Sequence, residues 1–216
     1  MTNKIFIIGS GGHCRPIAEC AIDLGYEIQA IIDVNKKSIR KTEKILGVIV
    51  KSKRELQKLK KNTKVFLAIG SNEIRSKYFE KKNKVLNFIN LIHPSAYVSK
   101  NIKIGKGNFI GPRVIINTKA QITNNCIINT SSIIEHEVKI FDNVHVAPGS
   151  IVCGRTRIHK NAFIGAGSVI FDNLKIGTNV KIGAGSVLNT NATSNSIYFG
   201  VPAKIKKNDI RFFFVF

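Results

Sequence analysis

The chain has 216 residues, of which 44% are hydrophobic, enough for one large or two small domains with a proper core. Lysine and arginine number 34 against 13 aspartates and glutamates, which gives a net charge of +21. No apolar run approaches the ~18 residues that a membrane-spanning helix needs. The four cysteines lack the spacing of metal ligands, which favours free thiols in a reducing cytoplasm.

The positive charge has two interpretations. Clustered cations interleaved with aromatic residues would indicate a nucleic-acid surface. The lysines of this chain are scattered instead, which favours a solvated surface and leaves nucleic-acid binding a remote alternative. A basic field also attracts small anionic substrates such as nucleotides and coenzyme A. The first residues lead directly into a strand pattern without the features of a signal peptide, so we expect a cytoplasmic protein.

The first ninety residues alternate between strand and helix patterns. In chain order we expect a strand at 5–8, a helix at 17–24, a strand at 30–33, a short helix at 51–59, a strand at 65–70 and a helix from 72 to about 84. Strands that alternate with helices predict a parallel sheet with right-handed crossovers. We therefore predict a small Rossmann-like domain over residues 1–90.

A glycine-rich turn, Gly9-Ser10-Gly11-Gly12-His13, joins the first strand to the first helix. Backbone N–H groups of such a turn can bind a phosphate at the start of a helix. We expect Pro16 at the first helical position, where its missing donor costs nothing. Cys14 stands where the dinucleotide fingerprint requires glycine, so that fingerprint fails. The turn is thus either a ligand site or a plain tight turn, with Asp33 at a neighbouring strand end.

From Ile92 to Leu188, every sixth residue is Ile, Val or Leu, over 17 consecutive hexads. A period of six fits neither an α-helix nor an alternating strand. It is typical of a parallel β-helix, in which each hexad forms one side of a coil. Three hexads per coil give about 5.7 coils and, at roughly 4.8 Å per coil, a prism about 27 Å tall. We assign residues 91–195 to this β-helix.

The register of the hexad also predicts the turns and the ends of the coil. The fifth residue is mostly small or apolar, so we expect it to point inward beside the aliphatic residue. A glycine or asparagine often follows the aliphatic residue, as at Gly105 and Gly165, and we assign it to the tight turn. Because the open end of a coil needs covering, we assign residues 196–216 to a C-terminal cap and tail. The phenylalanine-rich segment 211–216 either packs as part of the cap, contacts a neighbouring subunit or touches a membrane, and a packed cap is the simplest of the three.

Candidate acid–base chemistry centres on His136, which lies between Glu135 and Glu137. A carboxylate bonded to a histidine fixes the tautomer and raises the basicity of the ring, as a general base requires. The alternative is a surface polar cluster. Gly154 lies 18 residues later, so one full coil places it directly over His136 at roughly 4.8 Å. His145 is half a coil on and either faces the cleft of a neighbouring subunit or is simply packed.

Taken together, the motifs resemble the left-handed β-helix acyltransferases with hexapeptide repeats. More narrowly, the chain is similar to sugar acetyltransferases with a small nucleotide-binding domain before the coil. The matching segments are the glycine-rich turn at 9–13, Ala-Ile-Gly-Ser-Asn-Glu-Ile-Arg at 68–75, His-Pro-Ser-Ala at 93–96, residues 129–137, residues 145–149 and Gly-Val-Pro-Ala-Lys at 200–204. The Glu-His-Glu form looks most like the bacillosamine-type N-acetyltransferases.

This resemblance implies a role for each matching residue. His136 would be the general base, and Glu137 would raise its basicity. The positions that match the acetyl-CoA groove are His145, Gly154, Ala166 and Ala184. The positions that match nucleotide-sugar contacts are Gly11, Gly12, His13, Asp33, Val34 and Gly70. Ala184 departs from the family pattern by replacing a glycine, and Cys14-Arg15-Pro16 departs from it at the start of the first helix.

The resemblance further implies direct acetyl transfer from acetyl-CoA, without a metal, in a homotrimer with its cleft between adjacent prisms. The leading hypothesis is N-acetylation of the 4-amino group of a UDP-linked amino-dideoxy sugar. The alternatives are O-acetylation of sialic acid and N-acetylation of GDP-perosamine. From another class, a non-catalytic β-helix that binds metal remains open, although the chain lacks the histidine triad for it.

Overall fold

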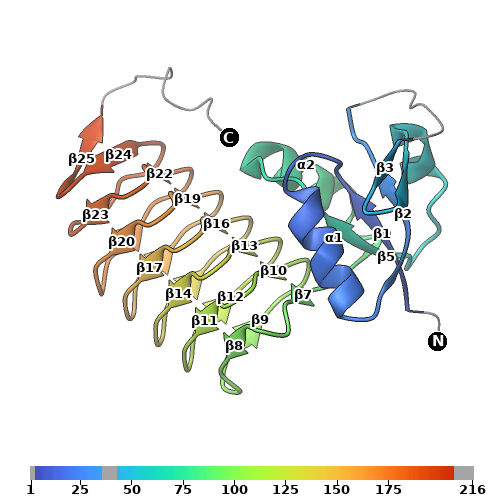
Figure 1. Ribbon diagram of the computed structural model, residues 1–216. Helices are drawn as coiled ribbons and strands as arrows, with labels where there is room; N and C mark the ends of the chain where they lie inside the picture. Colours follow the sequence, from blue (N-terminus) through green and yellow to red (C-terminus); the bar gives the residue numbers. More distant parts are fainter. Residues whose placement is uncertain (1–2, 36–42, 207–216) are drawn as a thin grey trace.

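The computed structural model describes residues 3–35 and 43–206. A small α/β unit lies beside the first coils of a long β-solenoid, which occupies the rest of the described chain (Figure 1). Helix α1 of that unit packs near β7, the first strand of the solenoid. The predicted order of a Rossmann-like unit followed by a β-helix is therefore confirmed.

The α/β unit contains one six-stranded sheet in the order β3-β4-β2-β1-β5-β6. All neighbouring strands are parallel except β3 and β4. Its elements are β1 (Lys4–Ile8), α1 (Cys14–Asp23), β2 (Glu27–Ile32), β3 (Lys44–Ile45), β4 (Val48–Lys51), a 3-10 helix (Lys53–Gln57), β5 (Lys64–Leu67), α2 (Asn72–Lys82) and β6 (Asn87–Phe88). The three buried strands β1, β2 and β5 follow the apolar runs that predicted them.

The first helix begins earlier than its apolar pattern suggested. Helix α1 starts at Cys14, with His13 as its N-cap residue, so Pro16 is the third helical residue rather than the first. The position is still harmless for proline, because none of the first backbone N–H groups of a helix has a partner inside it. Cys14 and Ile17 are fully buried against the sheet and extend the apolar face of the helix toward its start.

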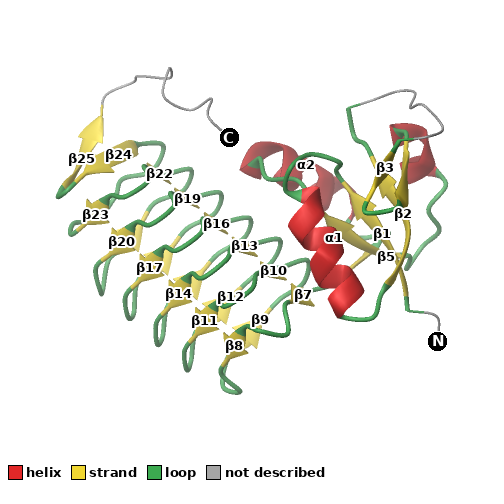
Figure 2. Cartoon of the chain, viewed as in Figure 1, coloured by secondary structure: helices red, strands yellow, loops and turns green. Residues whose placement is uncertain are grey.

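Three parallel sheets of two-residue strands form the solenoid (Figure 2). Face 1 contains β7 (Leu91–Ile92), β10 (Phe109–Ile110), β13 (Ile127–Ile128), β16 (His145–Val146), β19 (Phe163–Ile164) and β22 (Lys181–Ile182). Face 2 contains β8 (Tyr97–Val98), β11 (Ile115–Ile116), β14 (Ile133–Ile134), β17 (Ile151–Val152), β20 (Val169–Ile170) and β23 (Val187–Leu188). Face 3 contains β9 (Lys103–Ile104), β12 (Gln121–Ile122), β15 (Lys139–Ile140), β18 (Arg157–Ile158) and β21 (Lys175–Ile176).

The aliphatic residue of each hexad points into the coil, as predicted. From Ile110 to Leu188 these side chains are at most 2% exposed and form one continuous core. The small residues at the fifth hexad position are buried beside them. Buried serines there remain hydrogen-bonded: Ser150 Oγ donates to the carbonyls of Ala147 and Gly165, each at 2.8 Å. These serines are thus buried with their hydroxyl groups paired, whereas Thr123 Oγ1 and Asn125 Oδ1 of the coil are buried without a partner.

The turns differ from the prediction. The backbone is left-handed at the third residue after the aliphatic one, as at Glu137 (φ 61°) and Asn143 (φ 64°), and not at the residue directly after it. Gly165, which does follow the aliphatic residue, is required for another reason. A Cβ atom there would lie 2.5 Å from the backbone nitrogen of Ala184 in the next coil. These glycines therefore permit close stacking of coils, and the turn itself is made by the third residue.

One edge of the prism carries a column of asparagines at the left-handed turn position, in successive coils between face 3 and face 1. Each side-chain N–H donates to the amide oxygen of the next asparagine, at distances from 2.7 to 3.0 Å. The members of this amide column are Asn125, Asn143, Asn161, Asn179 and Asn195. The start of α2 docks on it: Asn143 Nδ2 donates to the carbonyl of Asn72 at 2.7 Å.

The C-terminal end of the coil is covered by a hairpin of β24 (Ile197–Gly200) and β25 (Ala203–Lys206), which continues face 1. The ring of Phe199 lies against Gly183, where a Cβ would overlap it. The hairpin supplies the cap that the open end requires. The phenylalanine-rich segment 211–216, expected to belong to the cap, lies outside the described residues.

Candidate active site

His136 lies at the corner between face 2 and face 3, in the turn between β14 and β15. Its Nδ1 is 3.2 Å from Oε2 of Glu137, and both side chains are nearly half exposed, at 45% and 46%. Glu135 supports the same turn, since its Oε2 accepts from Asn117 Nδ2 at 3.0 Å and from the backbone N–H of His136 at 3.4 Å. The arrangement holds the imidazole through Nδ1 at an open corner, which leaves Nε2 to meet a ligand.

Gly154 lies against the imidazole, as the spacing of one coil predicted. A Cβ atom at this position would be 2.7 Å from both Cε1 and Nε2 of His136. Any side chain at residue 154 would therefore displace the ring. The next residue extends the link between coils, because the N–H of Arg155 donates to the carbonyl of His136 at 3.0 Å. Glycine at residue 154 therefore lets the imidazole of His136 pack directly against the backbone of the following coil.

Residues predicted to contact a nucleotide sugar gather at the carboxyl edge of the α/β sheet. Asp33 is buried, and its Oδ2 accepts from Ser10 Oγ in the glycine-rich turn at 2.5 Å. Its Oδ1 accepts from the backbone N–H of Asn35 at 2.8 Å. Gly11 and Gly12 are exposed, with nothing within 4 Å of where a Cβ would stand. Open space above the turn and an acid at the neighbouring strand end are the features of a nucleotide site in such sheets.

His145 lies on face 1, under the α/β unit, and not at the corner of His136. Its ring is 6.1 Å from that of His13 and 5.1 Å from that of Phe163, measured between centroids. Burial lowers the pKa of His145 well below its usual value, and the charge of Arg75 lowers it further. The same two causes lower the pKa of His13 to about 4. Both imidazoles are therefore neutral near pH 7.

Arg75 of helix α2 is the buried cation behind these two histidines. It is 1% exposed, and its guanidinium bridges the two units of the chain. Nε donates to the carbonyl of Asn125 at 3.1 Å and Nη2 to that of Asn143 at 3.0 Å, both in the coil. Nη1 donates to the carbonyl of Gly70 at 3.0 Å. Burial lowers the pKa of Arg75 to about 10, so the group stays charged at neutral pH.

These neutral histidines predict that the fold loses stability in acid. Because the folded-state pKa of His13 is about 4 and the usual value is 6.5, the unfolded chain binds more protons between these limits. The free energy of unfolding is therefore highest above pH 6.5. Between pH 6.5 and 4, this one histidine lowers it by up to about 1.4 kcal/mol for each unit by which the pH decreases. Urea unfolding from pH 7.5 to 4.5 measures this slope. In a His13→Asn variant the slope should be smaller, and an unchanged slope would contradict this account.

The predicted acetyl-CoA residues do not meet within one chain. Ala166 and Ala184 lie in turns at the corner between face 1 and face 2, whereas His136 and Gly154 lie at the corner between face 2 and face 3. His145, on face 1, is grouped with the nucleotide-sugar residues. Arg75 has no predicted role from sequence, since one arginine among 34 basic residues gives no signal of burial. Its burial follows from the docking of α2 on the coil.

Among the described residues, no cluster of three or more metal-ligating side chains occurs. No helix in the same part of the chain is long and apolar enough to span a bilayer.

Both units match known proteins. Residues 4–82 match the PglD N-terminal domain, and residues 89–200 match the GMPPB C-terminal domain. The structure is similar to a histidine-to-asparagine mutant of perosamine N-acetyltransferase from Caulobacter crescentus in complex with CoA and GDP-perosamine. The TM-score is 0.87 at 31% identity, covering 95% of this chain and 97% of that chain. It is also similar to the acetyltransferase domain of PglB from Neisseria gonorrhoeae in complex with acetyl coenzyme A, with a TM-score of 0.87, 28% identity, and coverage of 95% and 100%.

UDP-N-acetylbacillosamine N-acetyltransferase of Bacillus subtilis is 32% identical over 106 residues, which are 48% of this chain and 49% of that protein. The chain thus spans about half the length of this curated relative, and 20% of the length of another. The fold class is a left-handed parallel β-helix preceded by an α/β unit. The chain belongs to the hexapeptide-repeat family of sugar acetyltransferases, which confirms the predicted family.

Proposed function

We propose that this protein transfers the acetyl group of acetyl-CoA to the 4-amino group of a UDP-linked amino-dideoxy sugar, with His136 as general base. The observation that carries the proposal is the geometry of the corner: Nδ1 of His136 is 3.2 Å from Glu137, and the ring lies over Gly154. A histidine held in this way by a carboxylate has the form of a general base. The similarity to nucleotide-sugar N-acetyltransferases supports the choice of substrate class.

In the proposed reaction, His136 Nε2 accepts a proton from the sugar amine as the amine nitrogen bonds to the thioester carbonyl carbon. Glu137 stabilises the imidazolium that forms, because its carboxylate faces Nδ1. The C–S bond then breaks, the thiolate takes the proton from the imidazolium, and the amide product leaves. Backbone N–H groups of the coil turns stabilise the oxyanion between these steps. No covalent enzyme intermediate and no metal are required.

The nucleotide sugar is proposed to bind to the α/β unit. We assign binding to the turn at Gly11, Gly12 and His13, with Asp33 and Val34 at the end of β2 and Gly70 after β5. The buried Asp33, fixed by Ser10 and Asn35, is suited to a ribose or base contact. The neutral His13 imidazole can donate or accept a hydrogen bond without adding charge.

Face 2 supports assembly as a homotrimer. Its outward residues are all apolar and partly exposed: Tyr97, Ile115, Ile133, Ile151, Val169 and Val187. A continuous apolar strip of this kind is typical of a protein interface. If three copies turn face 2 toward a common axis, the His136 corner of one copy lies beside the face 1–face 2 corner of the next. His136 would then face Ala166 and Ala184 of that neighbour, whereas His145 stays buried under the α/β unit of its own chain.

The substrate is tested by acetyl-transfer assays with a UDP-4-amino-4,6-dideoxy sugar, GDP-perosamine and sialic acid in parallel. We expect the highest kcat/KM with the UDP-linked amine. A preference for GDP-perosamine would retain the chemistry and change the nucleotide. A preference for sialic acid would replace N-acetylation by O-acetylation, and absence of transfer to all three acceptors would contradict the proposed function.

A further inference from the structure

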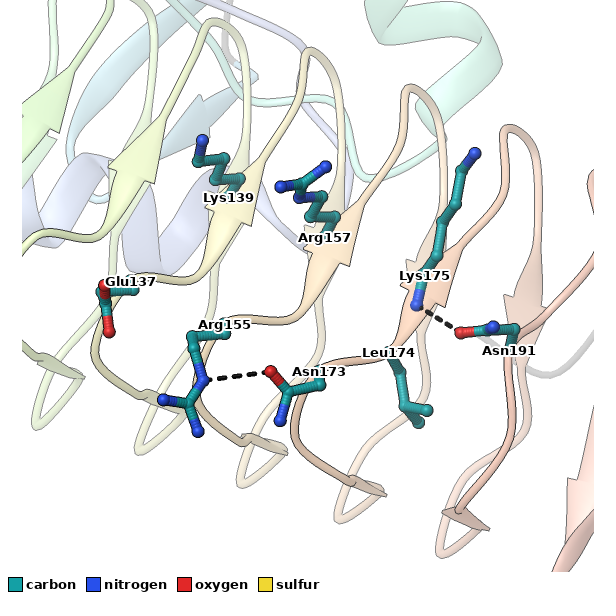
Figure 3. Close-up of a pocket in the computed structure, with 8 residues that line it drawn as sticks. All are labelled: Glu137, Lys139, Arg155, Arg157, Asn173, Leu174, Lys175 and Asn191. Carbon is teal, nitrogen blue, oxygen red and sulfur yellow. Dashed lines mark hydrogen bonds between the residues drawn. The ribbon is translucent and has the colours of Figure 1, made fainter.

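Face 1 differs from face 3 in the side chains on its outer surface. Figure 3 shows Lys139, Arg157 and Lys175 on three successive strands of face 3, which is the polar surface expected of a coil in water. The corresponding outward residues of face 1 also lie in direct register along the axis. In chain order they are Leu91, Phe109, Ile127, His145, Phe163 and Lys181. The α/β unit buries the first four, each at most 9% exposed, so Phe163 is the first in the row that reaches solvent.

Two ring contacts connect Phe163 with the glycine-rich turn. The ring of Phe163 meets that of His145 edge-on, with 5.1 Å between the centroids. The centroid of His145 is in turn 6.1 Å from that of His13, the last residue of the turn. An edge-to-face contact holds an aromatic ring in a defined orientation. Phe163 is therefore a fixed apolar surface, two rings away from the turn that is proposed to bind the nucleotide sugar.

The start of α2 docks on the coil immediately before Phe163. Asn72 Nδ2 donates to the carbonyls of Asn161 and Ala162, at 3.0 and 3.1 Å. Gly70, which is also proposed to contact the nucleotide sugar, lies two residues before Asn72. Two segments of the proposed acceptor site, the glycine-rich turn and the residues after β5, therefore converge on this ring.

Charged groups border Phe163 on the open side of face 1. Lys181 follows it in the row and is exposed. A hydrogen bond from Lys77 lowers the pKa of Glu73, and the charge of Lys181 lowers it further, so the start of α2 lies close to Lys181. Phe163 is thus an apolar contact beside charged groups. A ligand that matches it carries an apolar group on an otherwise polar body, as a deoxy sugar does.

We propose that Phe163 binds the methyl group of a 6-deoxy acceptor sugar and selects it over a sugar with a 6-hydroxyl group. This inference rests on the proposed function, because it takes the carboxyl edge of the α/β sheet as the acceptor site. A methyl group on the ring removes apolar surface from water. A hydroxyl group there would lose its hydrogen bonds to water, since the benzyl side chain offers no partner. Phe163 is a specificity residue and contacts no reacting atom.

The position of Phe163 also fits the proposed transfer step. The chain runs from Phe163 through the turn after β19 to Ala166, at the corner between face 1 and face 2. In the proposed trimer, that corner lies beside His136 of the neighbouring copy. The carbon that carries the amino group of the sugar is next to the carbon that carries the methyl group. A sugar with its methyl group on Phe163 would therefore present its 4-amino group to that imidazole.

Calorimetric titration of the full chain tests the selection. The two probes are a UDP-4-amino-4,6-dideoxy sugar and its counterpart with a 6-hydroxyl group. We expect the wild type to bind the 6-deoxy sugar with a Kd about 10- to 100-fold lower, the range in which an apolar site discriminates against an added hydroxyl. In Phe163→Ala the two Kd values should differ by less than about 3-fold, mainly through weaker binding of the 6-deoxy sugar. Phe163→Leu, which keeps an apolar contact, should retain most of the preference.

Two controls separate selection from folding. UDP alone should bind to the wild type and to both Phe163 variants with the same Kd, because the change lies outside the proposed nucleotide contacts. Phe141→Ala removes another partly exposed phenylalanine, stacked on His159 at the corner between face 3 and face 1, and should keep the wild-type ratio of Kd values. A general loosening of the α/β unit would raise all Kd values together and leave that ratio unchanged.

The outcomes also separate this inference from the proposed function. An equal ratio in the wild type and Phe163→Ala overturns the inference, and acetyl transfer by the wild type would then still support the function. A ratio that depends on Phe163, in a wild type that transfers no acetyl group, supports the inference while the function fails. A preference seen only with the GDP-linked pair of sugars, and lost in Phe163→Ala, would support the inference and replace the nucleotide. If the wild type binds none of these sugars, both are overturned.

Discussion

Replacing His136 by alanine should lower kcat for acetyl transfer at least about 1,000-fold, with little change in the Kd of acetyl-CoA. A general base contributes typically ~10²–10⁴-fold, and the attacking amine needs a lone pair throughout bond formation. The ring makes its contacts at an exposed corner and contributes little to the core, so the variant should fold. Steady-state kinetics, with calorimetric titration of acetyl-CoA, measure the two quantities separately.

Two companion variants sharpen this test. His159→Ala removes another histidine, stacked on Phe141 at a different corner of the coil, and should leave kcat near the wild-type value. Glu137→Gln keeps the side-chain shape and removes the carboxylate that faces Nδ1, so it should lower kcat, but less than His136→Ala does. Wild-type turnover by His136→Ala would rule out the proposed mechanism.

Replacing Arg75 by methionine should destabilise the docking of the α/β unit on the coil by about 3 kcal/mol or more. The substitution keeps much of the side-chain volume but leaves buried carbonyls of Gly70, Asn125 and Asn143 without their donor. An unpaired buried acceptor costs about 1–3 kcal/mol. The core inside the coil is a different cluster from the one that the α/β unit shares with Leu91, Phe109 and Ile127 on the outside of face 1, so we expect the α/β unit to loosen first. Hydrogen exchange of α2 and of the coil measures the two units independently.

The matched control is Arg54→Met, which removes an exposed arginine from the 3-10 helix and should leave exchange of α2 unchanged. In Arg75→Lys, the exchange rate of α2 should lie between those of the wild type and Arg75→Met. An ammonium group keeps the positive charge, but it lacks the planar fork with which the guanidinium reaches acceptors on both units. Equal exchange rates in wild type and Arg75→Met would show that Arg75 does not hold the units together.

Much of the fold was predictable because its signals are local. Position within a hexad decides whether a side chain points inward, so the buried stack from Ile110 to Leu188 follows from the sequence alone. The turn was misassigned for a physical reason. Gly165 is conspicuous in the sequence, but its role is contact with the next coil, whereas left-handed backbone occurs at residues as varied as Arg113, Ser131 and Glu137. The residue type at a position therefore does not tell whether that position makes the left-handed turn or lies in close contact with the next coil.

The candidate site was predictable where it depends on the period of the coil. The contact of Gly154 with His136 follows from a separation of one coil. The surroundings of His145 do not, because they depend on how the α/β unit packs on face 1. Nothing in a linear pattern indicates that His13 and Arg75 lie beside this ring. The sequence pattern of the α/β unit and the hexad repeat of the coil are independent of each other, so contacts between the two units cannot be predicted from either pattern.

The amide column has a consequence for how this protein can vary in length. Asn143, Asn161 and Asn179 each donate to the next member of the column and accept from the one before, so each of them depends on its place in the row. An insertion of a few residues at that edge would break the row, while the addition of a complete coil of 18 residues would extend it by one rung. Length variants that keep the fold should therefore differ by whole coils, or carry their extra residues at the two edges without the column. The edge on which the α/β unit docks is therefore the one where insertions should be tolerated least.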